Sequence, residues 1–268
     1  MTGRRTLAGR TILVTRPLEQ SRALVREIER RGAIAIVAPT IELVPARSAA
    51  LTRALRDLSD GAFAWITLTS RVTVEVLAAR IAPSEVRARV AAIGEGTSEA
   101  FRRWAGRDPD LVPTAFTTAA LARAFPRGHG RVLCARADIA PEGLEEALAA
   151  KGWRPERVDA YRTRLARSLP PPARQALRDG RVDAVTFTSA STVRGFVNAL
   201  GPVKGTPKVV CIGPVTSREA REHGFRVAAV ARPHTIAGLV AALERALGPR
   251  DAGRRRPDAR RGDEPPGA

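Results

Sequence analysis

The chain has 268 residues, a formal net charge of +18 and 44% hydrophobic residues, but only 4% aromatic ones. This length and apolar content suit one large domain or two of ordinary size, each with a buried core. The charge points to a polyanionic partner, either nucleic acid or a small polycarboxylate, and the scarcity of aromatic side chains excludes a long platform for stacking bases.

The cysteines and histidines predict neither a disulfide nor a metal site. Cys134 and Cys211 each lie inside an apolar run, which is typical of reduced, buried thiols. The three histidines show no metal-ligand spacing, and we expect no metal and no cofactor. Since no apolar run approaches the roughly 20 residues of a membrane span, we expect a soluble cytoplasmic protein.

Short runs rich in Val, Ile, Phe and Ala alternate with amphipathic segments along the body of the chain. The helix after the first run is expected to stop near Gly32. In chain order, the runs predicted to be strands are TILVT (11–15), AIAIVA (33–38), FAWITLTS (63–70), RVAAIG (89–94), RVLCAR (131–136), DAVTFTS (183–189), KVVCIG (208–213) and RVAAVA (226–231). Continuous apolar strands separated by helices predict parallel sheets covered on both faces, an α/β fold. Residues 248–268 have no apolar periodicity and predict a disordered tail.

The chain repeats itself at an offset of about 120 residues. Ile93-Gly94 aligns with Ile212-Gly213, and Thr69-Ser70 aligns with Thr188-Ser189. Further matches pair Leu13 with Leu133 and Gly32 with Gly152. The repeat predicts an internal duplication that gives two similar parallel-sheet domains.

The repeat also marks four loops at which an apolar strand ends and a helix begins. Such loops bind ligands in open parallel sheets, because free N–H groups at a helix N-terminus attract anions. Each Ser or Thr also fits an ordinary helix N-cap, so the alternative for any one of them is purely structural. Arg16, Arg71 and Arg136 lie at or near strand ends, where they can meet carboxylates or remain surface charges.

Several segments in this order and spacing resemble the uroporphyrinogen-III synthase family. They are ILVTRP (12–17), WITLTS (65–70), AIGEGTSEA (92–100), LVPTAFTTAAL (111–121), VDAYRT (158–163), VTFTSASTV (185–193) and CIGPVTSREA (211–220). The resemblance spans about residues 10–245. It departs from the family pattern at Arg71, where the family often has a small residue or proline after Thr-Ser.

The resemblance implies a crossed-over domain organisation, whereas the repeat alone is compatible with tandem domains at 10–121 and 131–240. The expected fold is two flavodoxin-like domains joined by a two-stranded β-ladder. Domain 1 is then discontinuous and comprises residues 1–37 and 167–247. Domain 2 comprises residues 46–158. The linkers 38–45 and 159–166 connect the two domains.

The resemblance further implies cofactor-free closure of hydroxymethylbilane, with inversion of ring D through a spiro intermediate and release of water. The partner is thus a small-molecule tetrapyrrole polycarboxylate rather than nucleic acid or membrane, and the protein is expected to be a monomer. Tyr161, the only tyrosine, matches a family tyrosine and is the candidate general acid; alternatively it packs the hinge. The candidate substrate-binding residues are Arg16, Ser70, Arg71, Thr97, Ser98, Ser189, Ser191, Thr192, Gly213 and Thr216.

Two other functions stay open at this point. A regulatory module of the same fold would bind a tetrapyrrole or another anion without catalysis. A flavin- or nucleotide-binding protein would use the hydroxyl-rich loops for phosphate, although few aromatic residues are available to sandwich a flavin.

Overall fold

The computed structural model describes residues 6–201 and 205–248, which divide into two compact units. Unit 1 contains the described chain up to Ile41 and again from Leu165, and unit 2 contains Glu42–Arg164. The tail predicted at 248–268 lies, beyond Gly248, outside the described residues.

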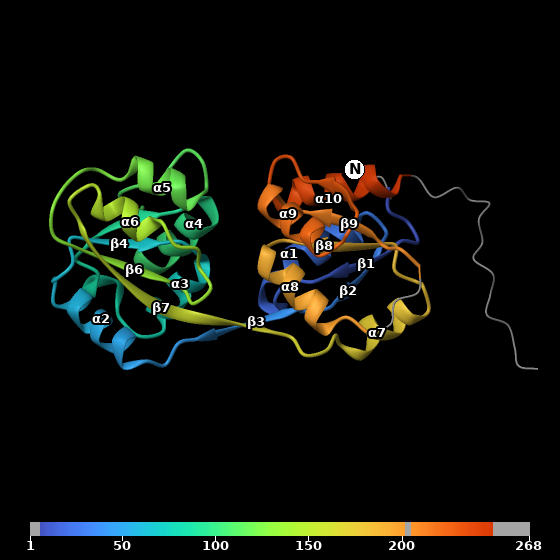
Figure 1. Cartoon of the computed structure of the whole chain (residues 1–268), viewed down its shortest axis with the longest axis horizontal. Coiled ribbons are helices and arrows are strands. Elements are labelled where there is room, and N and C mark those ends of the chain that lie inside the picture. Colours follow the sequence, from blue (N-terminus) through green and yellow to red (C-terminus); the bar gives the residue numbers. More distant parts are fainter. Residues whose placement is uncertain (1–5, 202–204, 249–268) are drawn as a thin grey trace, which may run out of the picture. The chain divides into compact units, whose positions relative to one another are not determined.

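Unit 1 is a five-stranded parallel sheet with helices on both faces (Figure 1). Its strand order is β10-β9-β8-β1-β2, and every neighbouring pair is parallel. When the five strands of unit 1 are numbered 1 to 5 in chain order, their order in the sheet is 2-1-3-4-5, as in flavodoxin-like sheets. The elements are β1 (Thr11–Val14), α1 (Leu18–Arg30), β2 (Ile34–Val37), α7 (Pro171–Arg178), β8 (Ala184–Phe187), α8 (Ala190–Ala199), β9 (Lys208–Cys211), α9 (Pro214–Glu222), β10 (Val227–Val230) and α10 (Ile236–Leu247).

Unit 2 has a sheet of order β3-β7-β6-β4-β5, whose pairs from β7 to β5 are parallel. The edge strand β3 runs antiparallel to β7, since Ala46 N–H donates to the Ala160 carbonyl while Ala166 N–H donates to that of Thr40, both at 2.9 Å. The elements are β3 (Ile41–Pro45), α2 (Ala49–Ser59), β4 (Trp65–Leu68), α3 (Arg71–Ala78), the 3₁₀ turn η1 (Pro83–Glu85), β5 (Arg89–Ala92), α4 (Glu95–Ala105), α5 (Thr118–Ala124), β6 (Arg131–Ala137), α6 (Leu144–Ala149) and β7 (Arg154–Leu165).

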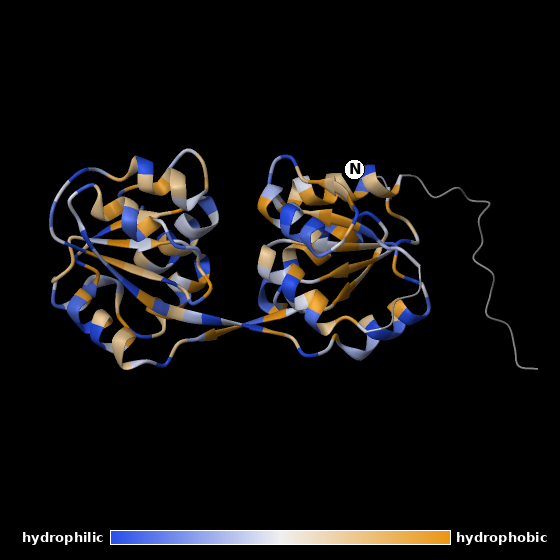
Figure 2. Ribbon diagram, in the orientation of Figure 1, coloured by the Kyte–Doolittle hydropathy of each residue, from blue (hydrophilic) through white to orange (hydrophobic). Residues whose placement is uncertain are grey.

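Each sheet is buried on both faces, because its apolar strands lie between two helical layers (Figure 2). In unit 2, α2, α3 and α4 pack on one face of the sheet and α5 and α6 on the other. In unit 1, α7, α8 and α9 cover one face and α1 and α10 the other. The predicted α/β class and the two parallel sheets are therefore confirmed.

The strands aligned by the sequence repeat hold matching places in the two sheets. The alignment pairs β9 with β5, β8 with β4 and β1 with β6, and the sheets contain β9-β8-β1 and β5-β4-β6 as neighbours in those orders. A parallel bridge between Ala91 and Leu111 extends unit 2 beside β5, in the place that β10 takes in unit 1. This correspondence supports the hypothesis of a duplication.

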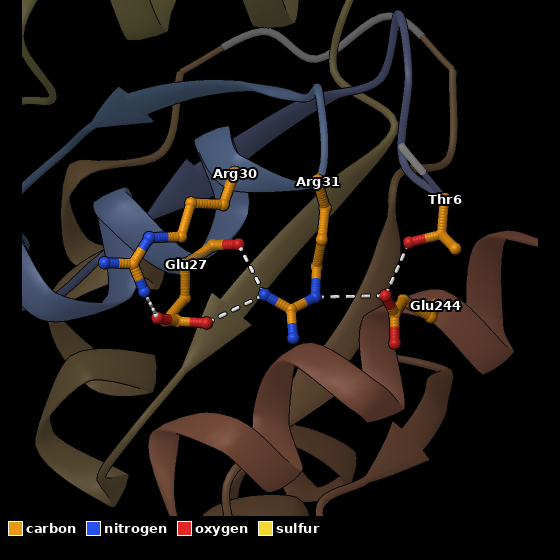
Figure 3. A network of polar contacts seen from close by, with 5 residues as sticks. All are labelled: Thr6, Glu27, Arg30, Arg31 and Glu244. Atoms are coloured by element: carbon orange, nitrogen blue, oxygen red, sulfur yellow. Dashed lines mark hydrogen bonds and ion pairs between the residues drawn. The ribbon is translucent and has the colours of Figure 1, made fainter. Parts of the chain in front are cut away.

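A polar network ties the beginning of unit 1 to its last helix (Figure 3). Arg31 donates through Nη1 to the carbonyl and the carboxylate of Glu27, and through Nε to the carboxylate of Glu244 on α10 at 3.0 Å. Thr6 donates its hydroxyl hydrogen to the same Glu244 oxygen. The pKa of Glu27 is lowered, chiefly by its hydrogen bond with Arg31. The network is therefore strongest with both carboxylates ionised.

Within the described ranges, no helix is both long and apolar enough to cross a membrane.

Candidate functional site

In both sheets, the helices that follow the two middle strands pack on opposite faces. In unit 2, α3 follows β4 on one face and α6 follows β6 on the other; in unit 1, α8 and α1 follow β8 and β1 in the same way. Doubly wound sheets bind ligands at such a switch point, beyond the carboxyl ends of the strands. The four predicted loops follow β4, β5, β8 and β9 at the carboxyl ends of these strands, and each is followed directly by a helix, as predicted. The loops after β4 and β8 adjoin the switch points.

Ser70 begins helix α3 at the carboxyl end of β4. Its Oγ accepts a hydrogen bond from the Thr73 N–H at 3.1 Å, which makes Ser70 a true N-cap. Arg71 is the first residue of the helix and pairs with Glu75 at 3.3 Å. The side chain of Arg71 is 38% exposed, so its guanidinium remains accessible from solvent.

Tyr161 lies on β7, buried in the core of unit 2, with the Ser70 hydroxyl nearby. Burial raises the pKa of its hydroxyl, and the charge of Asp138 acts in the same direction. The nearby Ser70 hydroxyl and the positive charge of Arg136 act to lower that pKa, but burial is the larger effect. The structure thus brings the candidate acid together with one of the predicted binding loops.

Arg136 is a fully buried cation at the carboxyl end of β6. Its Nη1 donates to both carboxylate oxygens of Glu145, at 2.9 and 2.8 Å, while its buried Nε has no hydrogen-bond partner. Glu145 is in the first turn of α6, where a negative charge is also favoured by the helix dipole. Arg136 could be singled out from the sequence as a polar residue at the end of an apolar strand, but no sequence signal marked Glu145 as its partner.

The second loop of unit 2 begins helix α4 at Gly94. Thr97 and Ser98 lie in the first turns of the helix and are 6% and 2% exposed. The Ser98 hydroxyl donates to the Gly94 carbonyl at 3.0 Å. Its bonding capacity is therefore partly used inside the helix, and the backbone N–H groups of this loop are the stronger candidates for binding an anion.

The ring of Phe116 lies against Gly94. A Cβ atom at Gly94 would lie 2.8 Å from both Cγ and Cδ1 of that ring, so a larger residue there would displace the ring from this position. Phe116 lies in the quoted segment LVPTAFTTAAL but was not among the predicted site residues.

In unit 1, Ser189 caps α8 in the same manner. Its Oγ accepts from the Thr192 N–H at 3.2 Å and lies 2.9 Å from the hydroxyl of Ser191. The Thr192 hydroxyl donates to the Ser189 carbonyl at 2.7 Å and is buried, so Thr192 serves the cap itself. Ser189 and Ser191 are half-buried and lie at the helix start.

The other loop of unit 1 begins α9 at Gly213, followed by Pro214, which has no N–H to donate. Thr216 is 4% exposed, and the neighbouring Ser217 is buried with no hydrogen-bond partner for its Oγ. Arg16 is half-buried after β1 and lies 3.4 Å through Nη2 from the Gln20 amide oxygen. These side chains lie at the carboxyl edge of their own sheet.

One pocket within unit 2, of about 750 Å³, lies away from these loops and is lined by Ser48, Arg56 and Arg80 among others, around α2 and the end of α3. It contains none of the predicted site residues. In the described part of the chain, no three His, Cys, Asp or Glu residues gather where they could hold a metal ion.

Comparison with known proteins gives a consistent result. A family model described as uroporphyrinogen-III synthase HemD matches residues 22–241. The chain is 31% identical over 255 residues to the uroporphyrinogen-III synthase of Synechococcus elongatus, covering 89% of this chain and 96% of that protein.

Two solved structures share the fold. One is a mutant uroporphyrinogen III synthase from the extremely thermophilic bacterium Thermus thermophilus, with a TM-score of 0.62 and 23% identity over 89% of this chain and 98% of that one. The other is uroporphyrinogen-III synthetase from Helicobacter pylori, with a TM-score of 0.60 and 16% identity over 87% of this chain and 97% of that one. With the family model matching most of its length, the chain belongs to the uroporphyrinogen-III synthase family.

Proposed function

We propose that this member of the family is an active cyclising lyase, which converts hydroxymethylbilane to uroporphyrinogen III and releases water. In the reaction that the family implies, the bilane loses its hydroxyl to give an azafulvene. The substituted carbon of ring D then attacks, and the resulting spiro intermediate fragments and recloses with ring D inverted.

The observation that carries this proposal is the repeated capped helix start at the carboxyl edge of each sheet. Ser70 begins α3 in unit 2, and Ser189 begins α8 in unit 1. The first N–H groups of a helix and its dipole attract carboxylates. A linear tetrapyrrole carries such carboxylates on its acetate and propionate arms, so both edges suit the same substrate.

The main task of the protein is positioning. The bilane also closes unaided to the type I isomer, so the enzyme must hold both ends of a flexible chain in one geometry. Fixing reacting groups in this way lowers the barrier, because their freedom is already lost on binding. We propose that Ser70, Thr97, Ser189 and Thr216, with their neighbouring backbone N–H groups, supply these contacts.

Tyr161 is the proton donor of the proposal. Its raised pKa keeps the hydroxyl protonated at neutral pH, so a proton is available for the leaving group. The departing hydroxyl takes that proton and leaves as water, while the electron pair of the adjacent pyrrole nitrogen forms the protonated azafulvene, an azafulvenium cation beside the tyrosinate. The proton released when the closed ring becomes aromatic again returns to the tyrosinate. The hydroxyl of Ser70, which begins α3 at the carboxyl edge of the sheet, lies near this donor.

An isomer analysis tests the proposal. Purified protein is supplied with freshly made hydroxymethylbilane, the products are oxidised, and the type I and type III isomers are separated. We expect type III product at a rate proportional to the protein concentration, and type I alone with heat-denatured protein. Type I alone from the native protein would contradict the proposal.

A further inference from the structure

Phe116 stands apart from the other aromatic residues by its exposure. All seven Phe, all three Trp and the single Tyr lie within the described residues. The other ten are buried or half-buried, whereas Phe116 is 63% exposed. Large exposed aromatic side chains are frequent at binding surfaces, because their apolar area is available to a partner.

The backbone holds Phe116 at the carboxyl edge of the unit 2 sheet. The residue lies between Leu111, which bridges to the strand β5, and Thr117, the N-cap of α5. Thr117 N–H donates to the Ala115 carbonyl at 2.9 Å and closes a tight turn around Phe116. One side of the ring packs on Gly94, the first residue of the loop that begins α4. The rest of the ring remains exposed beside that helix N-terminus.

Unit 1 has a ring in the corresponding place. A Cβ atom at Gly213 would lie 3.7 Å from Cγ of His234, so the imidazole faces the start of α9 as Phe116 faces the start of α4. Positions 116 and 234 are also counterparts in the repeat, one residue before the aligned Thr117 and Thr235. The His234 ring is tied by Nδ1 to the Ala231 carbonyl at 2.8 Å. A ring beside a helix start thus occurs in both units, and in unit 2 it is apolar.

Building on the proposed function, we propose that Phe116 is a substrate-contacting residue that packs against a pyrrole ring of the tetrapyrrole. A substituted pyrrole presents an apolar face and, beside it, anionic arms. Phe116 offers an apolar surface and the start of α4 offers N–H donors, held next to each other by Gly94. The contact is a binding contact, and no bond to Phe116 forms or breaks.

The test compares Phe116→Ala, Phe116→Trp and the control Ile34→Ala. Ile34 is 60% exposed, nearly as much as Phe116, but lies at the start of β2 in unit 1, at the opposite, amino end of its strand. The measured quantities are KM for hydroxymethylbilane, kcat, and the inhibition constant of uroporphyrinogen III under anaerobic conditions. Because Phe116 is exposed, its truncation should leave the melting temperature unchanged.

We expect Phe116→Ala to raise KM and the inhibition constant together, about three- to tenfold, the usual worth of one aromatic contact. The kcat should stay within about twofold, since the contact is made in both the bound and the reacting states. Phe116→Trp and Ile34→Ala should both stay within about twofold of wild type.

Unchanged KM and inhibition constant in Phe116→Ala would overturn the inference. A fall in kcat alone would also overturn it, because it would show that Phe116 positions the loop and does not bind the substrate. A wild-type protein that makes type III product while Phe116→Ala binds normally would refute the contact and leave the proposed function standing. If the wild type makes no type III product, the proposed function fails. The inference about Phe116 then fails as well, whatever the inhibition constant.

Discussion

Nη1 of Arg136 donates to both carboxylate oxygens of Glu145, and the arginine side chain is only 1% exposed. The pair joins the end of β6 to the first turn of α6, beside the strand that carries Tyr161. Because a buried guanidinium stays charged, its burial requires a compensating negative charge, which the Glu145 carboxylate supplies.

Glu145→Gln should therefore destabilise the protein by about 3 kcal/mol, measured as the free energy of unfolding in urea, because it leaves an uncompensated buried charge. The double variant Arg136→Met with Glu145→Leu should recover much of that loss. As a control, Glu156→Gln removes one partner from the half-buried Arg131 pair, which is far more accessible than Arg136, and should cost at most about 1 kcal/mol. Equal losses for Glu145→Gln and Glu156→Gln would show that burial adds nothing to the Arg136 pair.

Unit 2 is expected to fold by itself. A fragment of residues 42–164 contains all five strands of the sheet from β3 to β5, lacking only the end residues Ile41 and Leu165, and both of its helical layers. It should show one cooperative unfolding transition. A fragment of residues 1–121 lacks β6 and β7 of unit 2 and most of unit 1, so it should not. The reverse result would favour the tandem division that the repeat alone permits. The finer limits at 46–158 and at the linkers stay predictions.

Apolar runs predicted the strands well because strands buried on both faces are continuous apolar segments. TILVT contains β1, and FAWITLTS contains β4. The length of β7 was harder to predict. Its sequence from Arg154 to Leu165 begins with a proline and several charges and looks like a strand followed by a linker, yet it forms one strand. Pairing with β3 across the antiparallel edge keeps it extended, and that partner lies more than a hundred residues away.

The four loops were predictable, but the use of each hydroxyl was not. Thr192 and Ser98 donate to backbone carbonyls within their own helix starts, whereas Ser70 accepts from the Thr73 N–H. A Ser or Thr at the start of a helix can either cap the helix or face a ligand. The sequence is the same in both cases, and only the side-chain rotamer distinguishes the two roles. Phe116 gave no periodic signal, because its importance rests on a contact with Gly94.

Ser189 offers a way to separate capping from substrate binding. Ser189→Ala removes the cap of α8 and should cost about 1 kcal/mol of stability. Ser189→Asp should keep that stability, because aspartate caps equally well. If carboxylates bind at this helix start, the added negative charge should raise KM several-fold above that of the Ala variant. Equal KM values for the two variants would show that substrate does not approach Ser189.

The thiols of Cys134 and Cys211 should be unreactive in the native protein. Burial raises the pKa of Cys134 and of Cys211 to about 12, so at pH 8 neither forms the reactive thiolate. Ellman's reagent should react with both only after unfolding. Because the pKa values are higher in the folded state, the unfolded chain loses these protons first, and stability should fall as the pH rises from about 8.5 toward 12. The double variant Cys134→Ala with Cys211→Ala should show a shallower fall, and an equally steep one would assign the pH dependence to other groups.

Tyr161→Phe tests the proton donor directly. The substitution removes one hydroxyl and no packing volume, so the core of unit 2 should keep its stability. If the hydroxyl protonates the leaving group, kcat should fall by about 10²–10⁴, the usual worth of a positioned acid. KM should change little, because the contacts to the carboxylates remain. A matched control is Ser70→Ala, which removes the nearby hydroxyl and leaves that of Tyr161 in place, so its kcat should fall less.

The isomer ratio distinguishes a slow enzyme from one that misdirects ring D. Orientation fixes the isomer, so product that leaves the Tyr161→Phe enzyme should still be type III. As turnover slows, free bilane accumulates and closes unaided, and the type I fraction of the whole mixture should rise. Doubling the variant enzyme should then raise the ratio of type III to type I, whereas an enzyme that itself made type I would give a ratio independent of dose. Near-wild-type turnover by Tyr161→Phe would assign Tyr161 to core packing and leave a bound water as the next candidate for the acid.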